Sequence, residues 1–191
     1  MIDDKRPRLI VGFLQVRNEV ASGHLERFLA VNGELFDHLY VYDDASDDGT
    51  PDCLEAYGAT VIRGARRQFG REQFNRHDLL NRVLADIEVD DFIFWLDADE
   101  VVYASRGEIE DICDALSAEG YDGAELPHIN LWRSPDYLRT DDGFDALRPI
   151  RLWRNNGRLE FVPMMGLHLP MHPAGMGAIA QLEAPAVVHF G

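Results

Sequence analysis

The sequence predicts an α/β protein with a mostly parallel sheet flanked by helices and with a loop-rich second half. Short apolar runs, typical of strands buried on both faces, alternate with amphipathic helical patterns as far as Gly120. This alternation is typical of βαβ units, whose crossover helices cover the two faces of a sheet. Beyond Gly120, short strand-like pieces are separated by loops rich in Pro, Gly, Asp and His.

The first two predicted strands lie before residue 43. The run 9–14 is continuously apolar, as expected for a strand covered on both sides. Apolar residues then recur at helical spacing between 25 and 31, and Gly33 is expected to end that helix. A second strand, 38–42, leads into the acidic turn 43–50.

The next elements carry clear start and stop signals. Thr50 is predicted to be the N-cap of a short helix, with Pro51 at its first position and Gly58 at its end. A third strand is predicted at 60–62, and a longer helix with one apolar side at 72–87.

The strand 92–96 is the most apolar of all, and a capping box of Ser105 and Glu108 opens the helix that follows it. The strand-like pieces of the second half are 123–126, 149–153, 159–162 and 186–190. Because neither a repeat nor a linker is visible, one domain covering 1–191 is predicted.

The net charge of -16 limits the possible partners. No basic stripe offsets it, so binding to nucleic acid or to anionic lipid is disfavoured. A phosphorylated small substrate would also be repelled unless a cation or a local group of arginines reverses the sign. The apolar run 9–14 is too short to span a bilayer, and the charged segment 1–8 lacks an apolar signal core. We therefore expect a cytoplasmic protein without an integral membrane segment, with Cys53 and Cys113 as buried thiols.

Two predicted strands end in carboxylates, at Asp43-Asp44 and at Asp97-x-Asp99. Ligands of open parallel sheets bind beyond the carboxyl ends of the strands. In an extended chain residues two apart face the same way, so Asp97 and Asp99 can reach one site. Carboxylate oxygens suit Mg²⁺, Mn²⁺ or Ca²⁺ better than Zn²⁺. A solvated turn is the alternative, but the apolar strand places these charges at the boundary of the core, where unpaired charges are costly.

Three segments of the chain together resemble family-2 glycosyltransferases. Residues 41–50, VYDDASDDGT, resemble the signature vDDxSxDGT, residues 16–19 the xxNE element, and residues 94–100 the flDaDe segment, with matching spacing. The resemblance implies a GT-A-like, Rossmann-type fold, a nucleoside-diphosphate sugar donor and a divalent metal, Mn²⁺ or Mg²⁺. It divides the domain into a nucleotide-sugar-binding half, 1–103, and an acceptor-side half, 104–191.

The resemblance also implies roles for individual residues. Asp44 would hydrogen-bond the base, typically uracil, and Arg17 and Glu19 would line the nucleoside pocket. Asp97 would contact the ribose or the metal, and Asp99 would bind the metal directly.

Two further residues match positions of the family. Arg76 lies on the helix before the D-x-D strand and would approach the base or the pyrophosphate; a surface ion pair with Asp78 or Asp86 is the alternative. His189 lies in a segment similar to the final i.HyG strand and is the candidate for another metal ligand; a structural histidine is the alternative. Family members are expected to continue beyond this strand.

Sugar transfer with inversion needs a general base. Where one branch of the family has His-Glu, this chain has His168 followed by Leu169, so the expected carboxylate is missing. His168 and Glu160 are the candidate catalytic residues, and His172 is a weaker one.

The sequence thus favours a metal-dependent, inverting glycosyltransferase of the hexosyltransferase type, which moves a sugar from a UDP-sugar to a hydroxyl acceptor. A sugar-nucleotide-binding domain without turnover is one alternative, because the base is not identified. A calcium loop over Asp44 to Glu55 is another, although 39–42 reads as a strand where an EF-hand has a helix.

Overall fold

The computed structural model of the protein describes residues 6–68, 70–132, 134, 136–140, 143, 146–163 and 172–190. In chain order the elements are β1 (Ile10–Val16), α1 (Glu19–Ser22), α2 (His24–Asn32), η1 (Gly33–Leu35), β2 (His38–Asp43), α3 (Thr50–Tyr57), β3 (Thr60–Arg63), α4 (Glu72–Asp86), β4 (Phe92–Trp95), β5 (Glu100–Val102), α5 (Arg106–Glu119), β6 (Gly123–Glu125), β7 (His128–Leu131), β8 (Ile150–Arg154), β9 (Ile179–Gln181) and β10 (Val187–Phe190).

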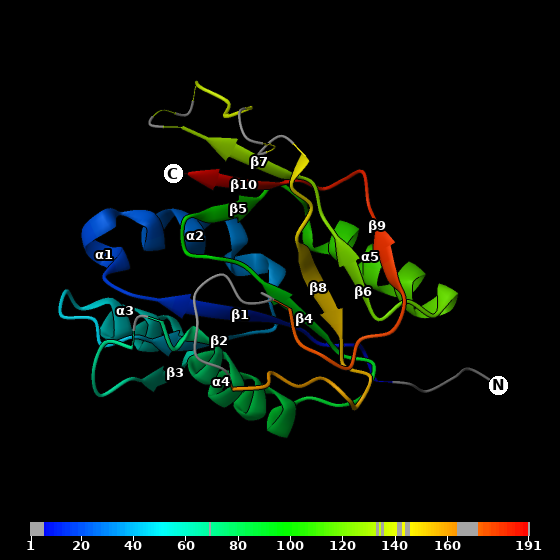
Figure 1. Cartoon of the computed structure of the whole chain (residues 1–191), viewed down its shortest axis with the longest axis horizontal. Helices are drawn as coiled ribbons and strands as arrows, with labels where there is room; N and C mark the ends of the chain where they lie inside the picture. The colour runs from blue at the N-terminus through cyan, green and yellow to red at the C-terminus, as the bar shows by residue number, and fades with distance from the viewer. Residues whose placement is uncertain are drawn as a thin grey trace.

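A seven-stranded sheet with the order β3-β2-β1-β4-β8-β6-β9 forms the centre of the molecule (Figure 1). The first four strands run parallel, β8 is antiparallel to both β4 and β6, and β9 is parallel to β6. The predicted α/β class with a mostly parallel sheet is therefore confirmed. Strands from both halves of the sequence share this sheet, so its core continues across residue 103.

Helices cover both faces of the sheet, as the alternating pattern predicts. Apolar residues of α2, α3 and α5 pack on one face against buried side chains of β1, β2 and β4. Leu79, Leu80 and Val83 of α4 pack on the other face, where Phe161 also lies. The capping box of Ser105 and Glu108 is present at the start of α5.

A smaller sheet, with the order β5-β10-β7, lies beside the main one (Figure 1). The sequence patterns identify only β10 of its strands, because β5 and β7 are four residues or shorter and each begins with a charged or polar residue. The strand expected over 159–162 does not form, and a single bridge between Glu160 and Ala174 occupies that place. This small sheet holds the segment after β4 against the end of β10, where Phe190 N–H donates to the carbonyl of Asp99 at 2.9 Å.

Thr50 has a different role from the one predicted. Gly49, with a φ of 86°, is the N-cap of α3, and Thr50 is the first helical residue. The Thr50 hydroxyl accepts hydrogen bonds from the N–H groups of Glu19 and Val20, at 2.9 and 3.0 Å. It also donates to Asp48 at 2.6 Å. The hydroxyl therefore caps α1, a helix distant in sequence, instead of its own.

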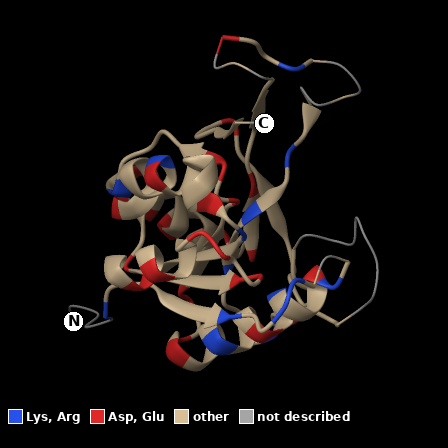
Figure 2. Ribbon diagram, turned by 90° about the vertical axis from the view of Figure 1, so that its left-hand side faces the viewer, with Lys and Arg blue, Asp and Glu red and all other residues tan. Residues whose placement is uncertain are grey.

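Two expectations about the surface can be compared with the structure. Cys113 is buried as expected, whereas Cys53 is exposed on α3. Within the described ranges, no helix is long and apolar enough to cross a membrane. Acidic residues are spread over helices and loops in the view of Figure 2, which agrees with the net charge of -16.

Candidate functional site

A cavity of about 370 Å³ lies at the carboxyl ends of β1, β2 and β4. This is the edge at which open α/β sheets bind their ligands. The side chains that line it come from the ends of these strands, the segment before α4 and the first turns of α4: Gln15, Val16, Arg17, Asp44, Arg67, Glu72, Arg76 and Asp97.

The charges that line this cavity are balanced, although the protein as a whole carries -16. Arg17, Arg67 and Arg76 face the same space as three acidic residues. Local charges affect the approach of an anion more than distant ones do, so this cavity is less repellent to a phosphorylated substrate than the net charge suggests, and a bound cation would make it attractive.

Several buried polar atoms around the cavity have no hydrogen-bond partner. They include Oε1 of Gln15, Nη1 of Arg17 and Nε of Arg76. A buried donor or acceptor without a partner costs about 1–3 kcal/mol, so such atoms need an explanation in a native structure. Their grouping around one cavity indicates a site shaped for a polar, hydrogen-bonding ligand.

Arg76 is a buried residue, and the alternative of a surface arginine paired with Asp78 or Asp86 does not apply. It is 8% exposed, its guanidinium lies 5.2 Å from the centre of the Trp95 ring, and its ion pair is with Glu72 at 3.4 Å. Burial lowers the pKa of Arg76, an effect that the charge of Glu72 opposes. A buried guanidinium facing a cavity is a strong donor for a phosphate or carboxylate.

Asp44 lies at the end of β2 with 8% of its surface exposed. Its Oδ1 accepts a hydrogen bond from the N–H of Gln68 at 2.8 Å, which fixes the carboxylate at the cavity wall. Asp48, another acid of the same turn, accepts hydrogen bonds from Ala21 and Thr50. Because these carboxylates serve different parts of the structure and β2 is a strand, the segment does not have the geometry of a calcium loop.

The sequence argument assumed that Asp97 and Asp99 lie in an extended chain. The structure instead holds them in a turn. β4 ends at Trp95, and the N–H of Glu100 donates to the carbonyl of Asp97 at 3.0 Å. The Glu100 carboxylate closes the turn by accepting from the N–H of Asp97 at 2.9 Å. The Asp97 side chain is 37% exposed, and partial burial together with the charge of Glu100 raises its pKa.

The structure places Asp99 and His189, two of the residues predicted as metal ligands, in direct contact with each other. Oδ2 of Asp99 lies 3.1 Å from Nε2 of His189, because β10 pairs with β5 in the small sheet. Burial alone would raise the pKa of Asp99, but the hydrogen bond and the charge of His189 outweigh burial and lower it. The same contact raises the pKa of His189.

The remaining predicted residues lie away from the cavity or outside the described chain. Glu19 lies on α1, where its carboxylate contacts Ser22 at 3.0 Å and His24 at 3.3 Å. Glu160 is exposed and does not line the cavity. His168 falls outside the described residues, so the predicted catalytic base has no structural description.

Two buried residues next to the turn were missed by the sequence argument. Glu100 and Arg151 are 1% and 3% exposed, and they form an ion pair beneath Asp97. The available signal was an arginine inside the apolar strand 149–153, since a charge in such a strand needs a buried partner. The partner itself lies 51 residues away and only the fold reveals it.

The carboxylates fit a divalent ion that is held jointly by protein and substrate. Among the described residues, no three His, Cys, Asp or Glu side chains are grouped so as to hold a metal by themselves. Mg²⁺ is usually bound through one or two carboxylates, with substrate phosphates and water completing the shell. Asp97 lines the cavity and Asp99 follows in the same turn, so the pair suits this mode of binding.

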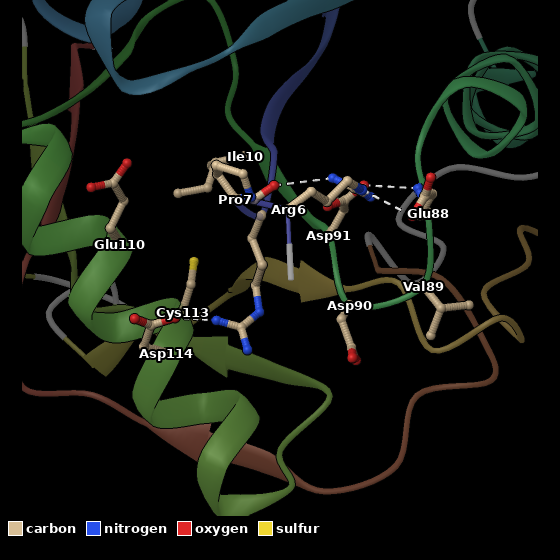
Figure 3. Close-up of a pocket in the computed structure, with 11 residues that line it drawn as sticks. Arg6, Pro7, Ile10, Glu88, Val89, Asp90, Asp91, Glu110, Cys113 and Asp114 are labelled. Atoms are coloured by element: carbon tan, nitrogen blue, oxygen red, sulfur yellow. Dashed lines mark hydrogen bonds and ion pairs between the residues drawn. The ribbon is translucent and has the colours of Figure 1, made fainter. Parts of the chain in front are cut away.

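A larger cavity, of about 600 Å³, lies at the opposite edge of the sheet, near the start of β1 (Figure 3). Most of its charged groups are paired with one another: Arg6 contacts Glu88 at 2.9 Å and Asp91 at 2.7 Å, and Arg8 contacts Asp114. The other two, Asp90 and Glu110, form ion pairs with arginines outside the cavity. Because these groups are satisfied and lie at the amino ends of the strands, the smaller cavity is the better candidate site.

Comparison with known proteins identifies the family of the chain. The sequence profile described as "Glycosyl transferase family 2" matches residues 17–129, which is more than half of the chain. The chain belongs to glycosyltransferase family 2. The matched region contains Arg17, Asp44, Arg76 and the turn of Asp97 and Asp99. The comparison with curated proteins found no match to this family-2 chain.

Solved structures of glycosyltransferases share the fold. Residues 1–349 of TarS from S. aureus match with a TM-score of 0.64 at 14% identity, covering 95% of this chain and 60% of that chain. Glucosyl-3-phosphoglycerate synthase from Mycobacterium tuberculosis, in complex with Mn²⁺ and UDP-glucose, matches with a TM-score of 0.57 at 18% identity, covering 96% of this chain and 72% of that chain. The predicted GT-A-like fold of this family-2 glycosyltransferase is confirmed by these matches.

Proposed function

We propose that this family-2 glycosyltransferase transfers a hexose-type sugar, with inversion, from a UDP-sugar to an acceptor hydroxyl, using Mn²⁺ or Mg²⁺. The observation that carries the proposal is the cavity at the carboxyl edge of the sheet, where Asp44 and Asp97 face Arg17 and Arg76. TarS has been solved in complex with UDP, and glucosyl-3-phosphoglycerate synthase in complex with Mn²⁺ and UDP-glucose, which supports this choice of donor and ion.

The cavity residues divide into a group for the nucleoside and a group for the diphosphate. Asp44, fixed by the Gln68 N–H, is placed to accept a hydrogen bond from the base. The unpaired N–H groups of Arg17 and Arg76 would donate to ribose or phosphate oxygens, which removes the cost of their burial. Glu19 does not line the cavity, so only the resemblance to the family supports a role for it in the nucleoside pocket.

Asp97 and Asp99 are proposed as the carboxylate ligands of the divalent ion, and His189 as a further ligand. When bound, the ion supplies positive charge that offsets the charge developing on the departing nucleoside diphosphate. His189 would have to exchange its present contact with Asp99 for the ion, or keep it and orient that carboxylate.

Transfer requires that one bond forms as another breaks. The acceptor oxygen bonds to the anomeric carbon from the face opposite the diphosphate, whose oxygen leaves with the electron pair of the old bond. The acceptor proton passes to a general base. We propose His168 for this base, because Glu160 is exposed and outside the cavity lining.

Calorimetry with UDP, with and without Mn²⁺, tests the assignment of the metal ligands. We expect the wild-type protein to bind UDP more tightly when Mn²⁺ is present, and Asp99→Ala to lose this gain while its melting temperature stays near that of the wild type. Asp111→Ala, an exposed acid on α5, is the matched control and should bind as the wild type does. An unchanged Mn²⁺-dependent gain in Asp99→Ala would contradict the assignment.

Turnover separates an enzyme from a sugar-nucleotide-binding domain without activity. Thermal-shift measurements on a panel of UDP-sugars would first identify the donor, since a ligand of the native state raises its melting temperature. Release of UDP from that donor is then measured with Mn²⁺ and a panel of hydroxyl acceptors. Donor binding without release of UDP under any of these conditions would favour the binding domain.

A further inference from the structure

The turn of Asp97 and Asp99 rests on a group of buried polar residues that come from four different elements. Asn32 of α2 and Glu100 of β5 are 0% and 1% exposed, while Asn130 of β7 and Arg151 of β8 are 5% and 3% exposed. None of them lines the cavity, so none is placed to contact the donor. Burying this many polar groups beneath one turn costs free energy unless they are hydrogen-bonded or paired with one another.

Glu100 is the centre of this group, because both of its carboxylate oxygens are engaged. Oε2 accepts from the N–H of Asp97 at 2.9 Å. Oε1 contacts the guanidinium of Arg151 and lies 2.8 Å from Nε2 of His128. The ring of His128 is itself held by Asn130, whose Nδ2 lies 3.0 Å from Nδ1. Glu100 therefore acts as a brace within the turn, with both of its carboxylate oxygens in contact with protein groups.

Arg151 joins this brace to Asp97. The same Nη2 that contacts Glu100 lies 3.5 Å from Oδ2 of Asp97, and the guanidinium packs 4.2 Å from the centre of the Trp95 ring. The arginine is thus a buried cation in contact with two acids of the turn, Asp97 and Glu100. Without it the repulsion between these two carboxylates would lose its nearest compensating charge.

We propose that Glu100 and Arg151 are positioning residues, which fix the Asp97–Glu100 turn so that Asp97 and Asp99 face the divalent ion together. The inference rests on the proposed function, since it assumes that these carboxylates bind the ion. Partners that orient a metal ligand normally change metal affinity roughly 10- to 100-fold when they are removed. A purely structural ion pair would instead lower stability and affect all ligand binding alike.

The experiment compares UDP affinity with and without Mn²⁺ in four variants. Arg151→Met removes the charge, Arg151→Lys keeps it, and Glu100→Gln keeps an acceptor for the Asp97 N–H. Arg154→Met is the matched control, because Arg154 lies at the other end of the same strand and pairs with Asp90, away from the cavity. Each variant is measured by calorimetry with UDP, alongside its melting temperature.

We expect Arg151→Met and Glu100→Gln to lose roughly 10- to 100-fold in UDP affinity only when Mn²⁺ is present. Metal-free UDP affinity should stay within about twofold, since Arg17, Arg76 and Asp44 are untouched. Arg151→Lys should recover part of the loss, and Arg154→Met should match the wild type in both conditions. Glu100→Gln and Arg151→Lys keep the test decisive if Arg151→Met does not fold.

Other outcomes would overturn the inference in distinguishable ways. If the wild-type protein shows no Mn²⁺-dependent gain in UDP affinity, the proposed function fails and the inference fails with it. If the wild type shows the gain and the Glu100 and Arg151 variants keep it, the positioning role alone is refuted. Equal losses with and without Mn²⁺ would also refute it, because they indicate a general structural defect.

Discussion

Replacement of Asn32 by alanine removes the side chain that joins α2 to the small sheet. Its Nδ2 donates to the carbonyl of Glu100 at 2.9 Å, and its Oδ1 accepts from the N–H of Val102 at 2.9 Å. β5 is an edge strand of that sheet, so the amide group of Asn32 takes the place of a neighbouring strand. Asn32 and Val102 are both 0% exposed, so water cannot replace these bonds without rearrangement.

The size of the effect follows from the two backbone groups that lose their partner. Each buried unpaired group costs about 1–3 kcal/mol, which gives a range of about 2–6 kcal/mol for Asn32→Ala. We expect a loss near 3 kcal/mol, because the smaller side chain leaves some room for relaxation. For a chain of this size about 2–4 °C is lost per kcal/mol, so the melting temperature should fall by roughly 6–12 °C.

Urea unfolding followed by circular dichroism at 25 °C, together with thermal melting, measures this loss. Asn81→Ala is the control, because Asn81 is exposed on α4 and should change stability by no more than about 0.5 kcal/mol. Asn32→Asp keeps the acceptor for Val102 but places a charge beside the Glu100 carbonyl, so it should be at least as destabilised as Asn32→Ala. A loss below about 1 kcal/mol for Asn32→Ala would show that the edge of β5 is satisfied in another way.

Two further predictions concern the signature turn and the thiols. Thr50→Val removes the hydroxyl that caps α1 and should cost about 1–2 kcal/mol in urea unfolding, whereas Thr50→Ser, which keeps it, should stay within about 0.5 kcal/mol; equal losses would refute the cap. Burial raises the pKa of Cys113 to about 12, so at pH 8 only the exposed Cys53 should react with a thiol reagent until the protein is unfolded. Because folding raises the pKa of Cys113, the stability contributed by its neutral thiol should be lost as the pH rises toward that value. Rapid reaction of both thiols in the native protein would contradict the burial of Cys113.

Much of the site could be predicted from sequence because its acids follow buried strands directly. The apolar run 92–96 fixes β4, and parallel strands bring their carboxyl ends to one edge, so Asp44 and Asp97 meet there. The predicted conformation of Asp97 and Asp99 was wrong, because a turn stands where an extended chain was expected. That turn depends on Glu100, whose partners His128 and Arg151 lie 28 and 51 residues away.

Local patterns by themselves determined the main-sheet strands of the first half, the helices with clear caps and the motifs of the family. These features depend on neighbours within a few residues, such as the capping box of Ser105 or the apolar run of β4. Only the tertiary structure decided that Thr50 caps α1, that Arg76 is buried against Trp95, and that a buried ion pair of Glu100 and Arg151 lies beneath the turn of Asp97 and Asp99. Those contacts join residues far apart in the chain. Their strength comes from polar groups that pair with one another where water is excluded, which no local pattern records.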